Sequence, residues 1–157
     1  MKGRILALAG AVAAVTGFAA HTPGAGGQQA VRYVAHLKGV NETPAHDIKA
    51  TGTANFRLEG RTLYYAIMVS GLSGKPTMAH IHRGAVGVAG PVVYGFPLKY
   101  PADSGTIDSG SVHLQGNLGH GVSGDSLMTL LNNGHAYVNV HTKRYPGGEI
   151  RGQITKE

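Results

Sequence analysis

The sequence predicts an all-β fold: an antiparallel β-sandwich or barrel with Greek-key-like connections and one short helix. Several segments alternate apolar and polar residues with a period of two, as half-buried strands do. Turn-forming residues separate these segments, and glycine alone supplies 25 of the 157 residues. The pattern lacks the regular strand–helix alternation that predicts a doubly wound α/β fold.

The first twenty residues have the pattern of a secretory signal peptide. A basic start precedes the uncharged, alanine-rich run 5–20, and small residues end it. We expect cleavage after Ala19 or Ala20, which leaves residues 21–30 as a flexible lead-in and residues 31–157 as one β domain. A retained membrane anchor is the alternative, but the run is shorter than the ~20 residues that a membrane span needs. The expected location is therefore the periplasm or the medium.

Composition excludes several kinds of chemistry and partner. The chain has no cysteine, which rules out disulfides, thiolate metal ligands and thiol catalysis. Its net charge of +6 is scattered along the sequence, whereas nucleic-acid binding needs a clustered basic footprint. We therefore expect no nucleic-acid partner and, after removal of the signal peptide, no membrane.

The N-terminal half contains the clearest strand patterns. Residues 31–38 alternate, with their apolar side chains on one face. Residues 50–58 and 62–69 form a predicted hairpin around the link 59–61, and residues 39–47 form a loop. The predicted core residues of the hairpin are Phe56, Leu58, Leu63, Tyr65, Ile67 and Val69.

The next segments continue the sheet. Residues 77–83 alternate as a strand, and the glycine-rich loop 83–91 follows without the Gly-Lys-Ser/Thr of a phosphate-binding loop. Residues 92–98 are predicted at a sheet edge, because Pro97 cannot donate a ladder hydrogen bond. Residues 106–114 form a further predicted strand.

The only helix predicted for the mature domain spans residues 126–132. Asp125 or Ser126 can cap its start, and Asn133-Gly134 is a typical stop. It leads into a strand at 136–142.

The last predicted strand, residues 149–154, closes the sheet. Ile150 and Ile154 should point inward. Glu149 and Arg151 share the opposite face, where we expect an exposed ion pair worth ~0–1 kcal/mol.

Three strand histidines are the sharpest chemical signal. His80 and His82 share one face of strand 77–83, and His141 lies on the non-core face of strand 136–142. Neighbouring strands bring cross-strand side chains to ~4.5–5.5 Å at Cβ, so the three rings could surround one ion. Imidazole suits copper and zinc, and copper leads the divalent affinity order. We expect binding to weaken as the pH falls toward ~6, because free histidine titrates near ~6.5.

Other residues could complete or support this site. Met78 shares the face of His80 and could favour Cu(I) through its thioether. Asn139 is the candidate that orients His141 from outside the ligand set, and His120 and His135 are expected to contribute little. A structural role, with the histidines hydrogen-bonded on a polar sheet face, is the alternative. The further candidate ligands are His113, His36 and His46.

Six motifs follow one another as in a known family, and the resemblance covers about residues 31–154. They are Asn41-Glu42-Thr43-Pro44, Thr51-Gly52-Thr53-Ala54, Ala79-His80-Ile81-His82, Gly90-Pro91-Val92, Tyr137-Val138-Asn139-Val140-His141-Thr142 and Gly147-Gly148-Glu149-Ile150-Arg151-Gly152. In this order the chain resembles the CHRD domain, the module named after chordin. The resemblance implies an extracellular β-sandwich.

The histidine pattern is also similar to the copper half of the Cu,Zn superoxide dismutases. That likeness implies copper ligation by His80, His82 and His141. The sequence departs from the dismutases in lacking their disulfide cysteines and a zinc-site loop.

Three functions remain open at this point. The first is an exported metal-binding protein, with copper as the expected ion and zinc as the second choice. The second is a metal-free extracellular interaction or adhesion module, which would bind a protein or polymer through Arg83, Lys143, Arg144 and Tyr145. The third is a copper redox enzyme of the superoxide dismutase type. We assign no catalytic residue, because the carboxylates form no obvious acid–base pair and no Gly-x-Ser-x-Gly elbow is present.

Overall fold

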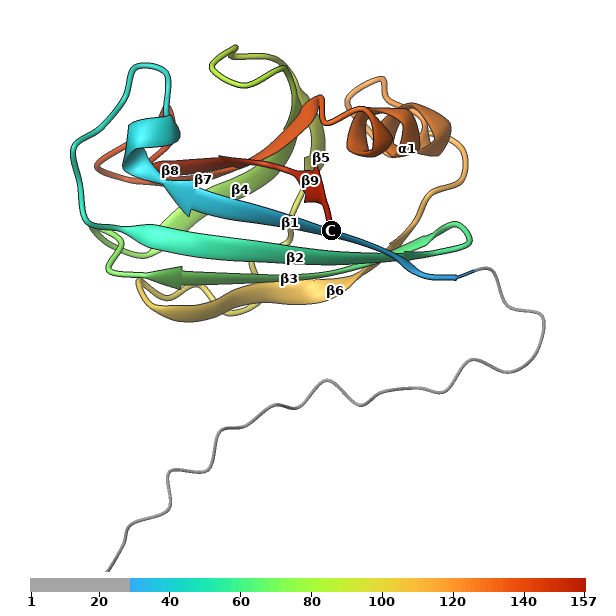
Figure 1. Cartoon of the computed structure of the whole chain (residues 1–157). Coiled ribbons are helices and arrows are strands. Elements are labelled where there is room, and N and C mark those ends of the chain that lie inside the picture. The colour runs from blue at the N-terminus through green and yellow to red at the C-terminus, as the bar shows by residue number, and fades with distance from the viewer. Residues whose placement is uncertain (1–28) are drawn as a thin grey trace, which may run out of the picture.

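The structure, a computed structural model, describes residues 29–157. The predicted signal peptide and most of the lead-in lie outside the described residues. Within this range, nine strands form one antiparallel sheet with the order β5-β4-β7-β8-β1-β2-β3-β6, and β9 pairs with β1 (Figure 1). The all-β prediction is therefore confirmed. The strands are β1 (Val31–Lys38), β2 (Thr51–Glu59), β3 (Thr62–Ser70), β4 (Pro76–Arg83), β5 (Val92–Gly95), β6 (Gly105–His113), β7 (Ala136–Thr142), β8 (Ile150–Gln153) and β9 (Thr155–Lys156).

The sheet bends over itself where β8 meets β1. Only Lys38 and Arg151 pair in register there. Gly152 permits the close approach, since a Cβ at this position would overlap the backbone carbonyl of His36. As a result β5, β4, β7 and β8 lie over β1, β2, β3 and β6 as a second layer (Figure 1). The order β8-β1-β2-β3 has the form of a Greek key, in which a distant strand returns beside the first of three consecutive strands.

The apolar faces of the two layers meet in the core. All six predicted core residues of the β2–β3 hairpin are buried, as are Ile150 and Ile154. Each fully buried isoleucine or leucine contributes ~1.5–3 kcal/mol relative to an exposed one. The period-two pattern of the sequence therefore identified the core face correctly.

Strand β7 is buried on both faces, which the sequence did not predict. All seven residues of Ala136–Thr142 are buried, including the polar Asn139 and His141. Loops that return over the outer face cover them: Gly84 lies against the Tyr137 ring, and Pro146 accepts a hydrogen bond from His141. The sheet therefore has a polar layer between its outer face and the solvent.

Helix α1 (Gly124–Asn132) begins earlier than predicted. Its N-cap is Ser123, whose Oγ accepts a hydrogen bond from the Ser126 backbone N–H at 3.1 Å. Asp125, a predicted cap, lies in the first turn and pairs with Arg61 at 2.7 Å. The correction has a local reason: Gly124 packs so closely on the backbone of Leu114 that only glycine fits there.

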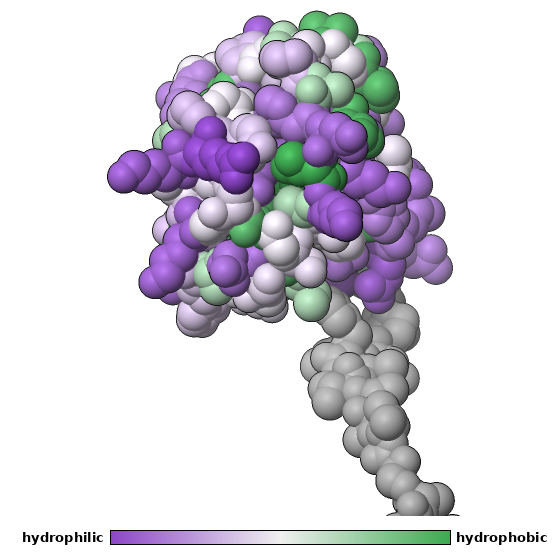
Figure 2. All heavy atoms as spheres, turned by 90° about the vertical axis from the view of Figure 1, so that its left-hand side faces the viewer, coloured by the Kyte–Doolittle hydropathy of each residue, from purple (hydrophilic) through white to green (hydrophobic). Residues whose placement is uncertain are grey.

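Two further features complete the fold. A 3-10 turn, η1 (Gly39–Asn41), lies within the segment predicted as a loop. The end of the molecule seen in Figure 2 is largely hydrophilic, with hydrophobic residues confined to limited patches. Across residues 29–157 no helix has both the length and the apolar character needed to cross a membrane.

Candidate metal centre

The three predicted histidines meet on the outer face of β4 and β7. One ring nitrogen from each of His80, His82 and His141 lies within 4.8 Å of the others. The strand register produces this cluster, because Met78 pairs with His141 and His80 pairs with Asn139. His141 is thus the diagonal neighbour of His80, and their ring centroids are 5.1 Å apart.

Backbone carbonyls orient two of the rings. His141 Nδ1 lies 2.9 Å from the Pro146 carbonyl oxygen, and His82 Nδ1 lies 2.9 Å from that of Gly90. A carbonyl only accepts, so each Nδ1 carries the proton and donates it. In a neutral ring the proton on Nδ1 leaves a lone pair on Nε2, the form in which histidine binds metals.

The remaining ring nitrogens of the cluster lie close together. His80 Nδ1 lies 3.2 Å from His141 Nε2, so in the metal-free protein His80 donates to His141. His82 Nε2 is buried and has no hydrogen-bond partner in the structure. Buried polar atoms are rarely left in this state, and ion binding at the atom is one of the recognised reasons. An ion would be held by Nε2 of His82, Nε2 of His141 and Nδ1 of His80, once the proton of His80 has moved from Nδ1 to Nε2.

Burial keeps all three rings neutral. It lowers the pKa of His80 to about 4, with further lowering by the charges of His141, His82 and His120. Burial also lowers the pKa of His82 and of His141, although their carbonyl hydrogen bonds act in the opposite direction. Metal binding requires neutral imidazole. Proton competition should therefore begin at a lower pH than the ~6 expected for free histidine.

Tyr137 and the Gly90 loop hold the His82 ring in place. The ring stacks on Tyr137 with centroids 4.9 Å apart and planes within 8°. The guanidinium carbon of Arg151 lies over the same Tyr137 ring, 3.4 Å from its centroid. Gly90, which holds His82 Nδ1, must be glycine because a Cβ there would overlap the Arg83 carbonyl oxygen. The stack and the loop together restrict His82 to one orientation.

Residues 33–154 match the family model described as the CHRD domain. The chain belongs to the CHRD domain family. CHRD domains are extracellular-type modules, and the match includes the whole histidine cluster with its covering loops. Comparisons with curated proteins and with solved structures found no match.

Asn139 has a different role in this CHRD domain from the one predicted. Its Nδ2 donates to Glu42 Oε1 at 2.7 Å, while the group that orients His141 is the Pro146 carbonyl. Burial raises the pKa of Glu42 to about 7, and the charge of Arg151 and the Asn139 hydrogen bond oppose this increase. Asn139 therefore ties the loop around Glu42 to β7.

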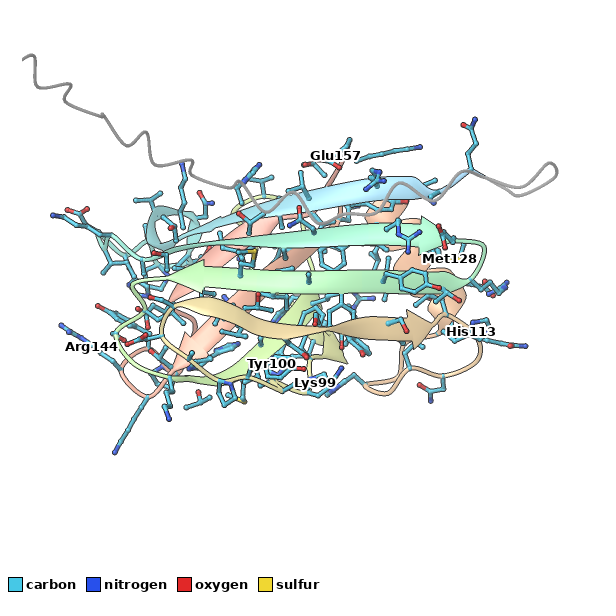
Figure 3. The ribbon with its side chains drawn as sticks, turned by 90° about the horizontal axis from the view of Figure 1, so that it is seen from below. Lys99, Tyr100, His113, Met128, Arg144 and Glu157 are labelled. Atoms are coloured by element: carbon cyan, nitrogen blue, oxygen red, sulfur yellow. The ribbon has the colours of Figure 1, made fainter. Side chains whose placement is uncertain are left out.

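Most of the additional candidate ligands lie away from the cluster. His36 is exposed on β1, and His113 lies at the end of β6, where it contacts Thr62 and Gln115 (Figure 3). His46 packs on Tyr145 with centroids 4.8 Å apart, and its Nε2 lies 3.1 Å from the Gly148 carbonyl oxygen. In the described part of the chain, the histidines of β4 and β7 are the group found with metal-binding geometry.

Two further residues, Met78 and His120, lie near the cluster. Met78 pairs with His141 and is 44% exposed, so its thioether is accessible beside the site. His120, expected to contribute little, lies close enough to affect the pKa of His80 and His82. The sequence contains one indication of a turn at His120, the flanking Gly119 and Gly121, but it could not show that this turn lies near the other histidines.

The prediction of an exposed ion pair between Glu149 and Arg151 is wrong. Glu149 is 1% exposed and accepts hydrogen bonds from Ser73 N, Ser73 Oγ and Thr142 Oγ1 at 2.5–2.7 Å. Arg151 is 3% exposed and donates to the carbonyl oxygens of Ala85 and Val88. The physical reason is the polar layer over β7 and β8, which buries this face and gives each charge separate partners.

Proposed function

We propose that this CHRD domain is an exported protein that binds one copper ion through His80, His82 and His141. The observation that carries the proposal is the buried, unpartnered Nε2 of His82 beside the nitrogens of the other two rings. Export is supported by the signal-peptide pattern of residues 1–20 and by the extracellular type of the family.

The geometry is close to that of a bound site. Ligand nitrogens at ~2.0–2.1 Å from a common ion lie at most ~4 Å apart, taking the zinc–nitrogen distance as a guide. The candidate nitrogens lie within 4.8 Å, so a movement of about an ångström would complete the site. An all-imidazole set suits both copper and zinc, and the affinity order favours copper.

Metal titration of the mature protein, made without a histidine tag, tests this proposal. Cu(II), Cu(I) and Zn(II) are titrated into the wild type and into a variant with His80, His82 and His141 all replaced by Ala. We expect one copper per chain in the wild type and loss of binding in the triple variant. A matched control replaces the exposed His36 and His113 with Ala and should keep the wild-type affinity. Equal copper affinity of the triple variant and the wild type would refute the proposal.

An extracellular interaction module is the second candidate, favoured by one observation. Val86 is 79% exposed and Val88 is 53% exposed on the loop that covers Arg151. Exposed apolar side chains beside the basic Arg83 could contact an extracellular protein or polymer. This function becomes the leading one if the triple variant retains copper binding.

A copper-dependent dismutase is the third candidate. It predicts that the copper-loaded wild type, but not the triple variant, removes superoxide faster than free copper does. Absence of that difference in a copper-loaded protein would leave binding alone as the function.

A further inference from the structure

We infer that His46, in the loop between β1 and β2, is a positioning residue of the candidate metal site. Its side chain holds the turn 145–148 between β7 and β8, and the Pro146 carbonyl of this turn orients the ligand His141. The inference rests on the proposed copper function, and it gives His46 no contact with the ion.

The last step of this chain of contacts is the ring of His141. Its Nδ1 donates to the Pro146 carbonyl oxygen at 2.9 Å, and its Nε2 lies 3.2 Å from His80 Nδ1. The Pro146 carbonyl therefore keeps the proton on Nδ1 and leaves Nε2 for an ion. A displaced carbonyl would let the His141 ring rotate or change its tautomer, and groups that orient a metal-binding histidine typically contribute roughly 10–100-fold to affinity.

The turn itself does little to set the direction of that carbonyl. Pro146 and Gly147 are exposed, and a Cβ at Gly147 would meet no other atom within 4 Å. The Gly148 N–H donates to the Tyr145 carbonyl oxygen at 3.1 Å, which closes the turn but does not tie it to another part of the fold. Two of its four residues are glycine, which loses the most conformational freedom when it is held. Contacts from outside the turn must therefore restrict its tilt.

His46 makes two such contacts, one on each side of Pro146. Its Nε2 lies 3.1 Å from the Gly148 carbonyl oxygen and donates to it, since a carbonyl only accepts. Its ring packs on the Tyr145 ring with centroids 4.8 Å apart and planes 43° apart. One imidazole thus holds both ends of the four-residue turn, with the Pro146 carbonyl between them.

The backbone of His46 is fixed to the sheet. Its N–H donates to the carbonyl oxygen of Gly39 at 2.9 Å, and Gly39 begins η1 directly after β1. Within η1, Asn41 Nδ2 donates to the Arg151 carbonyl oxygen of β8 at 3.0 Å. The 3-10 turn η1 and the β7–β8 connection lie at the same end of the molecule (Figure 1). His46 therefore connects a rigid part of the fold to the turn that orients His141.

A separate contact keeps the His46 loop on β7. Glu42 Oε1 accepts a hydrogen bond from Asn139 Nδ2 at 2.7 Å. Both side chains also fill the space beside Gly148, where a Cβ would lie 2.4 Å from Asn139 Nδ2. Substitution of His46 should therefore release the turn while the loop stays in place.

The test replaces His46 in three ways in the mature protein. His46→Gln keeps a side-chain donor for the Gly148 carbonyl but loses the ring, His46→Phe keeps a ring on Tyr145 but loses the donor, and His46→Ala loses both. The exposed His36→Ala is the matched control. Cu(II) affinity is measured by chelator competition. In the metal-free protein, the tautomer of the His141 ring is followed by nitrogen NMR, which a purely structural role of His46 would leave unchanged.

We expect His46→Ala to weaken Cu(II) binding about tenfold, as loss of a group that supports a ligand does. The His141 ring should change from the form protonated on Nδ1 to a mixture of tautomers. His46→Gln should bind Cu(II) more tightly than His46→Phe, because the hydrogen bond holds the carbonyl end of the turn. This comparison also serves if the alanine variant does not fold.

The other outcomes separate this inference from the proposed function. Wild-type Cu(II) affinity in all folded His46 variants would overturn the inference and leave the three-histidine site intact. Weaker binding with an unchanged His141 tautomer would also overturn it, because His46 would then act by another route. A wild type that binds no copper would refute the proposed function, and an unchanged His141 tautomer in the same variants would refute the inference separately.

Discussion

At the residue scale, the histidine cluster lowers the stability of the fold but keeps ring nitrogens available for an ion. Each ring is held neutral by burial, and His82 Nε2 is kept without a partner. A buried unsatisfied polar atom costs ~1–3 kcal/mol. The surrounding contacts, above all the stack on Tyr137, offset this cost and hold the ring in place.

The lowered pKa of His80 makes the stability of the metal-free protein depend on pH. In the unfolded chain histidine titrates near ~6.5, whereas in the folded protein the pKa of His80 is about 4. Between these values the unfolded state binds more protons, so the free energy of unfolding falls as the pH drops from about 6.5 to about 4. Urea denaturation across this range should show a smaller pH dependence in His80→Ala than in the wild type. Equal slopes for the two proteins would contradict the assignment.

Glu42 should produce a dependence of the opposite sign. Its pKa is raised to about 7 in the folded protein, above the ~4.3 of an unperturbed glutamate. The folded state binds the extra proton between these values, so this contribution to stability is lost as the pH rises through about 7. Glu42→Gln keeps the oxygen that accepts from Asn139 and cannot ionise. Its stability relative to the wild type should therefore increase from pH 5 to pH 8, and a constant difference would count against the shift.

Glu149 is expected to be a main contributor to stability. Hydrogen bonds to a charged group contribute ~1.5–3 kcal/mol each, and Glu149 accepts three. Glu149→Ala should lower the free energy of unfolding by about 3 kcal/mol or more. The control is Glu59→Ala, whose carboxylate is 40% exposed and pairs with Arg57, and it should cost at most ~1 kcal/mol. Similar losses for the two variants would restore the exposed ion pair predicted from the sequence.

At the scale of the element, the start of α1 gives a direct test of its cap. Ser123→Ala removes the acceptor of the Ser126 N–H and should cost ~1 kcal/mol. Ser126→Ala, within the first turn, keeps that cap and should cost less. Thermal unfolding of the two variants makes the comparison. A larger effect of Ser126→Ala would indicate that the helix begins two residues later, as its sequence pattern suggests.

The strands show what local sequence can and cannot predict. The alternation of side chains along β7 correctly places Val138 and Val140 in the core and Tyr137 and His141 outside it, because this alternation depends only on the pleat of the strand. Burial of the outer face was missed, because it depends on loops that return from elsewhere in the chain. The contacts of Glu42 with Asn139 and of Gly90 with His82 are of this kind. For the same reason, sequence could not place the turn that carries His120.

At the scale of the whole molecule, the cluster joins segments that are far apart in sequence. Its residues belong to β4 and β7, and the groups that hold them come from the loops at Gly90 and Pro146. The sequence predicted that the three histidines converge because the two strands have matching polarity. It could not specify that β4 lies beside β7 and not beside β3, which is decided by the fold of the entire sheet.

A site built across the fold should couple copper binding to global stability. An ion that binds only the folded state stabilises it by RT ln(1 + [L]/Kd), about 2.7 kcal/mol at a hundredfold excess of free ion over Kd. For a domain of this size that energy raises Tm by on the order of 10 °C. Copper should therefore raise the Tm of the wild type and of His113→Ala, whose imidazole lies at the far end of β6. The triple alanine variant should show no increase. An equal increase in that variant would mean that copper stabilises the domain from a different site, since the three strand histidines would then be dispensable for the coupling.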